Sequence, residues 1–389
     1  MSNNDPQSLP MIERLISFDT TSRNSNLELI EFIRIYLEDL GAETLLVYDD
    51  DKRKANLYAM LGSTERPSVV LSGHTDVVPV DGQDWDSKPF SLTRRNGRLY
   101  GRGTADMKSF IAVCLTYAPT ILNRNLQTPI HFAFSYDEEV GCAGVPRLLD
   151  KLAQFPVKPR ACIIGEPTQM GVVRAHKGKL SQRCHVRGLE CHSGLAHLGV
   201  NAVEAAAEVV AYLKDMARRF RDQGPYDPEL SPPYHTVHTG IIHGGTALNI
   251  VPKECWFDFE FRCLPGHDTA ELAKEVHAFA ERSLLPEMHA VHPDTGFSWE
   301  PLSSFPGLTT EEHTEVAQLA KACSGANTTG KVSFGTEAGL FDKAGIPAVV
   351  CGPGSIEHAH KPNEYVSIEQ VMRCEEFMDR LLDRLQTGL

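Results

Sequence analysis

Short apolar runs that end in ionisable residues constrain the fold of this chain more than any other feature. The segments "SVVLSGHTD", "PIHFAFSYDEE" and "ACIIGEPT" read as buried strands, and helical stretches separate them. Strands that alternate with helices predict a mainly parallel sheet with helices on both faces. In such sheets, ligands bind beyond the carboxyl ends of the strands. We therefore expect one sheet edge to gather five ionisable residues: His74, Asp76, Glu138, Glu139 and Glu166.

The pattern changes near residue 180. "KLSQRCHVRG" alternates like a half-exposed strand, a helix follows over 202–216, and "HTGIIHGGTALNIVPKECWFDFEFRCLPG" reads as two strands before a helix over 269–283. This order predicts a small α+β domain with an antiparallel sheet. At 389 residues, two domains are the expectation. We predict a catalytic domain over 1–180 and 294–389, with an inserted domain over 181–293.

Composition narrows the class of protein. A net charge of -13 argues against nucleic acid as a partner, because that binding needs an excess of Lys and Arg. No run approaches the roughly 18 apolar residues of a membrane span, and the N-terminus lacks a secretory pattern. The ten cysteines form no CxxC pair and several lie in apolar runs. We expect reduced thiols, a cytoplasmic location and no membrane partner.

Nitrogen and oxygen donors recur where a metal site would need them. His74 and Asp76 form an H-x-D pair, which suits an imidazole ligand held by a carboxylate. Each candidate also has an ordinary interpretation. His74 and Asp76 could lie in a turn, Asp106 could be a helix N-cap, and residues 137–139 could form a solvated acidic turn. Together, the candidate ligands are His74, Asp106, Glu139, Glu166 and His360. Such donors without a thiolate suit Zn²⁺, with Co²⁺ or Mn²⁺ as substitutes.

Five ligands exceed the three that a catalytic zinc usually takes from protein. They fit two metals about 3.5–4 Å apart that share one carboxylate. Glu139 is then a ligand, and Glu138 is free to take a proton from water. We assign Asp137 a structural role.

Five ordered motifs identify a resemblance: "SGHTDVVP", "GRGTADMKS", "DEEVG", "IIGEPT" and "CGPGSIEHAHKPNEY". Over nearly the whole chain, the sequence resembles the dinuclear zinc aminoacylase and carboxypeptidase family. The resemblance implies an α/β catalytic domain, an inserted lid and dimerisation domain, and a homodimer. It also implies two Zn²⁺ per subunit, with Co²⁺ a possible substitute, and an N-acylated amino acid as substrate.

The resemblance also implies roles for individual residues. Asp106 would bridge the metals, with His74 and Glu166 completing one site and Glu139 and His360 the other. Asp76 would orient His74, and the Asp106–Met107 peptide would be cis. Glu138 would act as general base and then as acid. His358, two residues before His360, would lie outside the ligand set.

For substrate binding, the inserted domain supplies three candidates. "RGLECHSGLAHLGVNA" places His192 where the family has a histidine that often acts from the partner subunit; His197 fits less well. Asn249 would give a polar contact and Arg262 would bind a carboxylate bidentately, although a surface cation is the ordinary interpretation of Arg262. In the catalytic domain, the backbone amides of Gly352 and Gly354 would bind the same carboxylate.

Within this family the chain looks most like members that act on acetylornithine, a resemblance to which "RAHKG" and "GTEAGLF" add with weaker specificity; it implies acetate and L-ornithine as products, for arginine biosynthesis. Acetylcitrulline, succinyl-diaminopimelate and general acylamino acids stay open, because the metal core is common to all. Glu337 is our candidate for the ornithine ammonium; the alternative is a solvated carboxylate at a helix start.

Two other classes fit less well. A metal-binding module without turnover has no use for Glu138. A dinuclear phosphoesterase needs a cationic pocket, which Arg262 alone does not supply.

Overall fold

The computed structural model describes residues 5–388, which form two compact units. The large unit comprises the chain up to Ala175, Leu308–Lys331 and the chain from Thr336 on; the inserted unit comprises His176–Gly307 and Val332–Gly335. We expected the insertion over 181–293. The difference arises mainly from β12 (Gly296–Phe305), a strand absent from our sequence analysis, which pairs with β9 (Gly178–Arg187) in the inserted unit.

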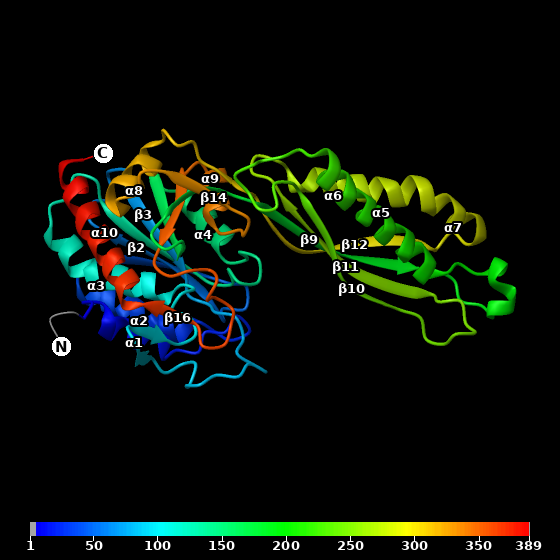
Figure 1. The fold of residues 1–389 in the computed structure, drawn as a ribbon, viewed down its shortest axis with the longest axis horizontal. Helices are drawn as coiled ribbons and strands as arrows, with labels where there is room; N and C mark the ends of the chain where they lie inside the picture. The colour runs from blue at the N-terminus through cyan, green and yellow to red at the C-terminus, as the bar shows by residue number, and fades with distance from the viewer. Residues whose placement is uncertain (1–4, 389) are drawn as a thin grey trace. The chain divides into compact units, whose positions relative to one another are not determined.

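A nine-stranded sheet forms the centre of the large unit (Figure 1), in the order β1-β2-β6-β3-β7-β15-β8-β13 with β14 on β8. The neighbouring strands β6, β3, β7 and β15 run parallel, whereas β1, β2 and β8 pair antiparallel. The parallel centre confirms the predicted fold class, and four strand ends meet there at one edge. The bounds are β1 (Glu43–Tyr48), β2 (Ala55–Leu61), β3 (Val69–His74), β6 (Ile130–Ser135), β7 (Ala161–Pro167), β8 (Val172–His176), β13 (Leu308–Thr309), β14 (Thr329–Val332) and β15 (Ala348–Gly352).

Helices cover both faces of this sheet. Along β3, Val69 and Leu71 belong to the core that the sheet forms with α1, α2, α3, α8 and α10, whereas Val70 faces the other side. The helices α4 and α9 contact strands from that side. The bounds are α1 (Leu9–Ile16), α2 (Leu27–Asp39), α3 (Lys108–Asn123), α4 (Val145–Leu152), α8 (Glu315–Ser324), α9 (Ala338–Lys343) and α10 (Ile368–Thr387). A small sheet of β4 (Thr93–Arg95), β5 (Arg98–Tyr100) and β16 (Tyr365–Ser367) completes the unit.

Helix α2 shows how the sequence pattern becomes structure. Leu29, Ile30, Ile33 and Leu37 form its buried stripe, whereas Ile35 is 47% exposed and the charged positions lie toward the surface. The helix ends just before Gly41, which has φ +92°, a conformation that a side chain would strain.

The inserted unit is an antiparallel sheet in the order β10-β11-β9-β12, with helices along one face (Figure 1). Phe257, Phe259 and Phe261 are buried against those helices, and the intervening residues of the strand are more exposed. The α+β prediction is confirmed. The remaining bounds are β10 (Thr236–Gly244), β11 (Glu254–Cys263), α5 (Ala202–Gln223), α6 (Thr269–Phe279), α7 (Leu285–Val291), a 3₁₀ helix η1 (Ser193–Leu198) and a π-helical turn η2 (Ala280–Leu284).

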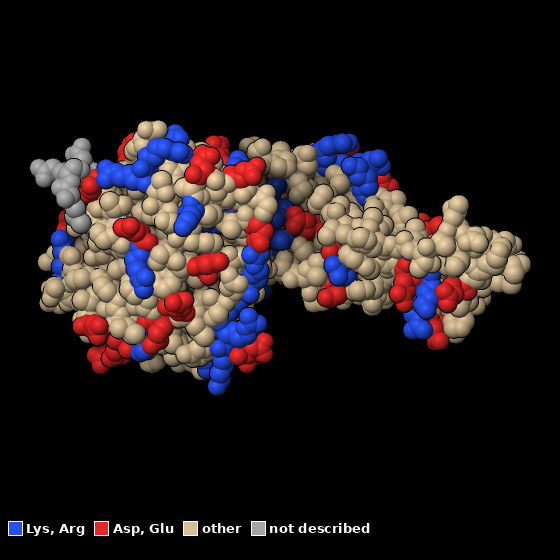
Figure 2. Space-filling model, turned by 90° about the horizontal axis from the view of Figure 1, so that it is seen from below, with Lys and Arg blue, Asp and Glu red and all other residues tan. Residues whose placement is uncertain are grey.

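Acidic and basic side chains are interspersed over the face that Figure 2 presents, so its Lys and Arg residues do not merge into one basic surface. None of the helices within residues 5–388 has the length and apolarity that crossing a membrane would take.

Candidate metal centre

The predicted ligands meet at the carboxyl edge of the parallel strands in the large unit. Because β3, β6, β7 and β15 are neighbours, the residues that end them or follow them lie close together. The ligands come from the end of β3 (His74), the loop before α3 (Asp106), the loop after β6 (Glu139), the end of β7 (Glu166) and the segment between β15 and β16 (His360).

Asp106 lies between two histidines. Its Oδ1 is 2.9 Å from Nε2 of His74, and its Oδ2 is 3.2 Å from Nε2 of His360. On the far sides, His360 Nε2 is 2.9 Å from Glu139 Oε2, and His74 Nε2 is 3.6 Å from Glu166 Oε1. Two oxygens that face different histidines are what a carboxylate shared between two cations requires. The peptide that follows this aspartate is cis, as the resemblance implied.

Asp76 acts on more than His74. The Nδ1 atom of His74 lies 2.9 Å from the backbone oxygen of Asp76 but 3.6 Å from its carboxylate. The carboxylate instead accepts the backbone N–H groups of Glu138 at 3.1 Å and Glu139 at 3.3 Å, and the hydroxyl of Ser22 at 2.7 Å. It therefore fixes the loop that carries the candidate base and a ligand.

Burial and like charge perturb the acidic groups of this cluster. Burial raises the pKa of Glu138 to about 8 and that of Glu139 to about 7. Burial also acts to raise the pKa of Asp106, but hydrogen bonds to His360 and His74 outweigh it and leave that pKa well below its usual range. Hydrogen bonds to Asp106, and next to Glu139, raise the pKa of the His360 imidazole to about 10.

The residues present fit a dinuclear metal group. The Oε1 atom of Glu139 is buried and has no hydrogen-bond partner among the described residues. Donor atoms of His74, Asp106 and Glu139 lie within 4.8 Å of one another, as do those of His74, Glu138 and Glu166. Divalent cations would offset the repulsion among these carboxylates. The donors are all nitrogen or oxygen, the set that Zn²⁺, Co²⁺ and Mn²⁺ accept.

The buried ion pair of Glu364 and Arg102 helps to hold the backbone of two candidate ligands, Asp106 and His360. Glu364 Oε1 accepts the backbone N–H of Asp106 at 3.1 Å, and its Oε2 accepts from Arg102 at 2.7 Å. Arg102 also donates to Gln83 at 2.6 Å, and the Gln83 amide donates to the backbone oxygen of His360 at 3.1 Å. Our sequence analysis assigned Glu364 no role, although it lies in the same motif as His360, four residues on. This short separation from His360 was the sequence feature that could have indicated a role for Glu364.

Two neighbouring residues that we left out of the predicted ligand set have partners of their own. Asp137 pairs with Lys54 at 2.5 Å. The Nε2 atom of His358 lies 2.8 Å from the hydroxyl of Tyr365.

Glu337 precedes α9 in the large unit and is only 1% exposed. Neither carboxylate oxygen has a hydrogen-bond partner among the described residues. Burial raises the pKa of this carboxyl to about 7, and the facing hydroxyl of Ser135 lowers it in part. The alternative of a solvated helix-start carboxylate is therefore wrong.

The two glycines expected to bind a carboxylate use their amides inside the large unit. Gly352 N–H donates to Thr168 Oγ1 at 3.1 Å, and Gly354 N–H donates to Gln370 Oε1 at 3.3 Å. Packing also requires glycine at position 352, because a Cβ atom there would lie 2.0 Å from the backbone oxygen of Gly165. Contrary to our expectation, the structure does not leave these amides free for a substrate.

The remaining candidates belong to the inserted unit. His192, just before η1, is exposed, and its Nδ1 accepts the backbone N–H of Gly194 at 3.0 Å. The segment of Asn249 lies beside it, since the Asn249 backbone oxygen accepts from Ser193 at 3.0 Å. Arg262, on β11, is half-buried, and its Nε lies 3.3 Å from Glu260 Oε1.

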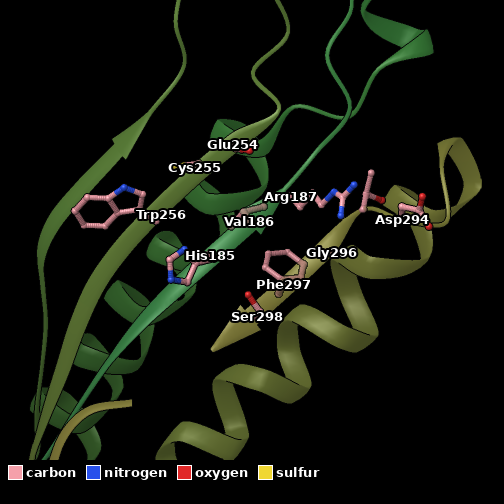
Figure 3. A pocket seen from close by; sticks show the side chains of 11 residues that line it. His185, Val186, Arg187, Glu254, Cys255, Trp256, Asp294, Gly296, Phe297 and Ser298 are labelled. Atoms are coloured by element: carbon pink, nitrogen blue, oxygen red, sulfur yellow. The ribbon is translucent and has the colours of Figure 1, made fainter. Parts of the chain in front are cut away.

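A pocket of about 510 Å³ also lies in the inserted unit (Figure 3). It is formed by β9, β11, β12 and the turn before β12, and its lining includes His185, Arg187, Trp256 and Phe297. None of the residues that the motifs single out lines it. We therefore assign the candidate chemistry to the edge of the parallel sheet.

Two histidines and several carboxylates, gathered at the carboxyl edge of a parallel sheet with a further glutamate beside them, define a metal-dependent hydrolase. The sequence profile of peptidase family M20/M25/M40 matches residues 70–384. The chain belongs to this family.

Relatives and solved structures agree with this assignment. The chain is 34% identical to the acetylornithine deacetylase of Myxococcus xanthus, with 98% of each chain covered. It is 32% identical to that of Pasteurella multocida, covering 98% of this chain and 99% of the other. Among solved structures, it resembles the M20 family metallo-carboxypeptidase Sso-CP2 of Sulfolobus solfataricus, with a TM-score of 0.76, 18% identity, and coverage of 98% and 99%. It also resembles YXEP of Bacillus subtilis, described as a dinuclear metal binding peptidase, with a TM-score of 0.65, 15% identity, and coverage of 98% and 99%.

Proposed function

We propose that this protein is a deacetylase that hydrolyses N2-acetyl-L-ornithine to L-ornithine and acetate, a step of arginine biosynthesis. The observation that carries the proposal is Asp106 between His74 and His360 with Glu138 beside the cluster. The acetylornithine deacetylases among its relatives match over nearly their full length, which supports the choice of substrate.

The metal content is part of the proposal. Asp106 would be the shared ligand of two Zn²⁺ ions, for which Co²⁺ can substitute. His74 and Glu166 would complete one site, and Glu139 and His360 the other. When bound, such ions lower the pKa of a water molecule toward about 7 and polarise a carbonyl group.

The chain's own residues would move the proton and hold the substrate. Glu138 would take a proton from the attacking water and deliver it to the nitrogen of the leaving amine. Two observations support this role for Glu138. It lies beside the candidate ligands, and no cationic side chain within residues 5–388 is hydrogen-bonded to its carboxylate. His192 would donate to the developing oxyanion, and Arg262 would bind the substrate carboxylate with help from Asn249.

Glu337 would recognise the side-chain ammonium of ornithine. A buried carboxylate without a hydrogen-bond partner is costly, and a cation relieves that cost. This is what supports Glu337 as the source of the preference for ornithine over apolar amino acids.

We also propose a cytoplasmic homodimer formed through the inserted unit. All ten cysteines are free thiols. Apolar side chains are exposed along the edge strand β10 and the loop after it, among them Ile241, Ile242, Leu248 and Ile250. His192 adjoins this segment through its pairing with Ile250, which supports its action in the partner's site.

A test of the dimer uses mixed chains. His192→Ala and Glu138→Gln chains, each inactive alone, should regain part of the activity when mixed, because one of the two hybrid sites then has both residues. Verified mixed dimers without any recovered activity would contradict action from the partner.

A deacylation panel tests the function itself. The zinc-loaded protein should be assayed with acetylornithine, acetylcitrulline, succinyl-diaminopimelate and acetylmethionine, by the release of amine. We expect the highest kcat/KM for acetylornithine. A clear preference for another compound would assign the protein to that sibling activity, and no turnover of any of them would refute the proposal.

A further inference from the structure

A buried thiol contacts the proposed base. The Sγ atom of Cys142 donates to Oε1 of Glu138 at 3.3 Å, and Cys142 is 2% exposed. Within residues 5–388, no other side chain makes a hydrogen bond to this carboxylate. Cys142 thus makes the one side-chain hydrogen bond, within the described residues, that can select a position for the Glu138 carboxylate.

The backbone is shaped to bring this thiol back to Glu138. The amides of Gly141 and Cys142 both donate to the backbone oxygen of Glu138 at 2.8 Å, which closes a tight turn. Cys142 adopts φ +57°, a left-handed conformation that is uncommon for a residue with a side chain. The turn therefore places the cysteine over the carboxylate four residues earlier, at a position where glycine would adopt the same backbone with less strain.

We propose that Cys142 is a positioning residue for the base: its thiol holds Oε1 of Glu138 and leaves Oε2 as the oxygen that receives the proton. The inference rests on the proposed function, in which Glu138 is the base. Oε2 would take the proton from the attacking water and release it to the leaving nitrogen, while Oε1 keeps its contact with the S–H group throughout. Cys142 itself would exchange no proton and form no covalent bond.

The chemistry of both partners suits this role. An ionised carboxylate only accepts hydrogen bonds, and its last torsion is broad, so one fixed oxygen narrows the orientations of the other. A thiol is a weak donor, which orients the carboxylate without removing its basicity. Burial, followed by the nearby charge of Glu138, raises the pKa of the Cys142 thiol well above its usual range, so the donor proton stays in place.

Infrared spectroscopy tests the contact without any substrate. The S–H stretching band of Cys142 is isolated by subtracting the spectrum of a Cys142→Ala variant. We expect this band at a lower frequency in the wild-type background than in a Glu138→Ala background, in which the thiol has lost its acceptor. The same band position in both backgrounds would overturn the proposal, whether or not the enzyme prefers acetylornithine.

Kinetics test the consequence. Cys142→Ala should lower kcat about fivefold, the scale of one weak hydrogen bond, with KM, metal content and melting temperature nearly unchanged. Cys142→Ser, which keeps a donor, should recover most of kcat. Cys323→Ala, which removes a buried thiol from α8, is the matched control and should leave kcat unchanged. An unchanged kcat in Cys142→Ala, or a serine variant no better than the alanine variant, would contradict the role.

Discussion

Glu364 holds Asp106 through the backbone: its Oε1 accepts the Asp106 N–H at 3.1 Å. The same carboxylate is paired with Arg102, and both side chains are buried. The Asp106 carboxylate is thus supported by a charged group that is not among the candidate metal ligands. Such indirect support sets how well a ligand is oriented before the metal binds.

Glu364→Gln should weaken metal binding. The amide keeps the shape but loses the charge that pairs with Arg102, and its single acceptor oxygen cannot serve both Arg102 and the backbone N–H of Asp106. We expect the dissociation constant for zinc to rise about 10- to 100-fold, measured by competition with a chromophoric chelator. Glu375→Gln is the matched control: this buried carboxylate hydrogen-bonds Ser8, so its loss should lower stability but leave zinc affinity unchanged. Equal zinc affinities for Glu364→Gln and the wild type would refute the supporting role.

Asp106→Ala should reduce the binding of both metals, because the two oxygens of Asp106 face different histidines. Glu139→Gln should reduce mainly one, since Glu139 Oε2 lies 2.9 Å from Nε2 of His360, its partner in the proposed second site. Metal analysis after dialysis at a fixed free zinc concentration distinguishes the two variants. Two tightly bound metals in Asp106→Ala, or the same loss in both variants, would be inconsistent with a shared ligand.

The convergence of the candidate ligands on one sheet edge could be predicted because it follows from sheet topology. His74, Glu139 and Glu166 end or follow apolar runs, and parallel neighbouring strands bring their ends to one edge. The supporting contacts could not be predicted in this way. Glu364 and Asp106 are 258 residues apart in sequence, and no periodicity reports a hydrogen bond over that separation.

The missed strand β12 has a local cause. Its sequence contains Pro301, which cannot donate in a ladder, and the pairing with β9 shifts register between Pro301 and Ser303. A proline in a mixed polar run predicts a loop, although an edge strand such as β12 tolerates it. The amides of Gly352 and Gly354 were misjudged because their partners, Thr168 and Gln370, come from other parts of the chain.

Glu337→Gln should lower kcat/KM for acetylornithine about tenfold, equivalent to about 1.4 kcal/mol, because the ammonium loses its counter-charge. Turnover of acetylmethionine, which has no ammonium on its side chain, should barely change. The measurement is the ratio of the two kcat/KM values in variant and wild type. An equal loss on both substrates would assign Glu337 a structural or general catalytic role.

His131→Gln should make the protein less sensitive to acid. Burial lowers the pKa of His131, whose Nδ1 lies 2.8 Å from the Tyr58 hydroxyl, to about 4. The unfolded chain, with a histidine pKa near 6.5, binds more protons between those values, so stability falls as the pH drops from about 6.5 to about 4. The histidine accounts for about 3 kcal/mol of that fall, at about 1.4 kcal/mol per pKa unit.

Urea unfolding of both chelator-treated proteins at a series of pH values in this range measures the effect. The free energy of unfolding should decline less steeply with falling pH in His131→Gln than in the wild type. Parallel curves would show that His131 does not titrate as described.

The most direct test of the account is the Glu138→Gln variant assayed with acetylornithine while its metal content is measured on the same sample. The neighbouring carboxylates are assigned as metal ligands, so none of them can act as the base in place of Glu138. An amide cannot accept the proton of the attacking water. We predict wild-type zinc content and a kcat lowered by about two to four orders of magnitude, the usual scale of general-base catalysis. A variant that keeps both metals and more than about a tenth of the wild-type kcat would contradict the assignment of Glu138 as the base.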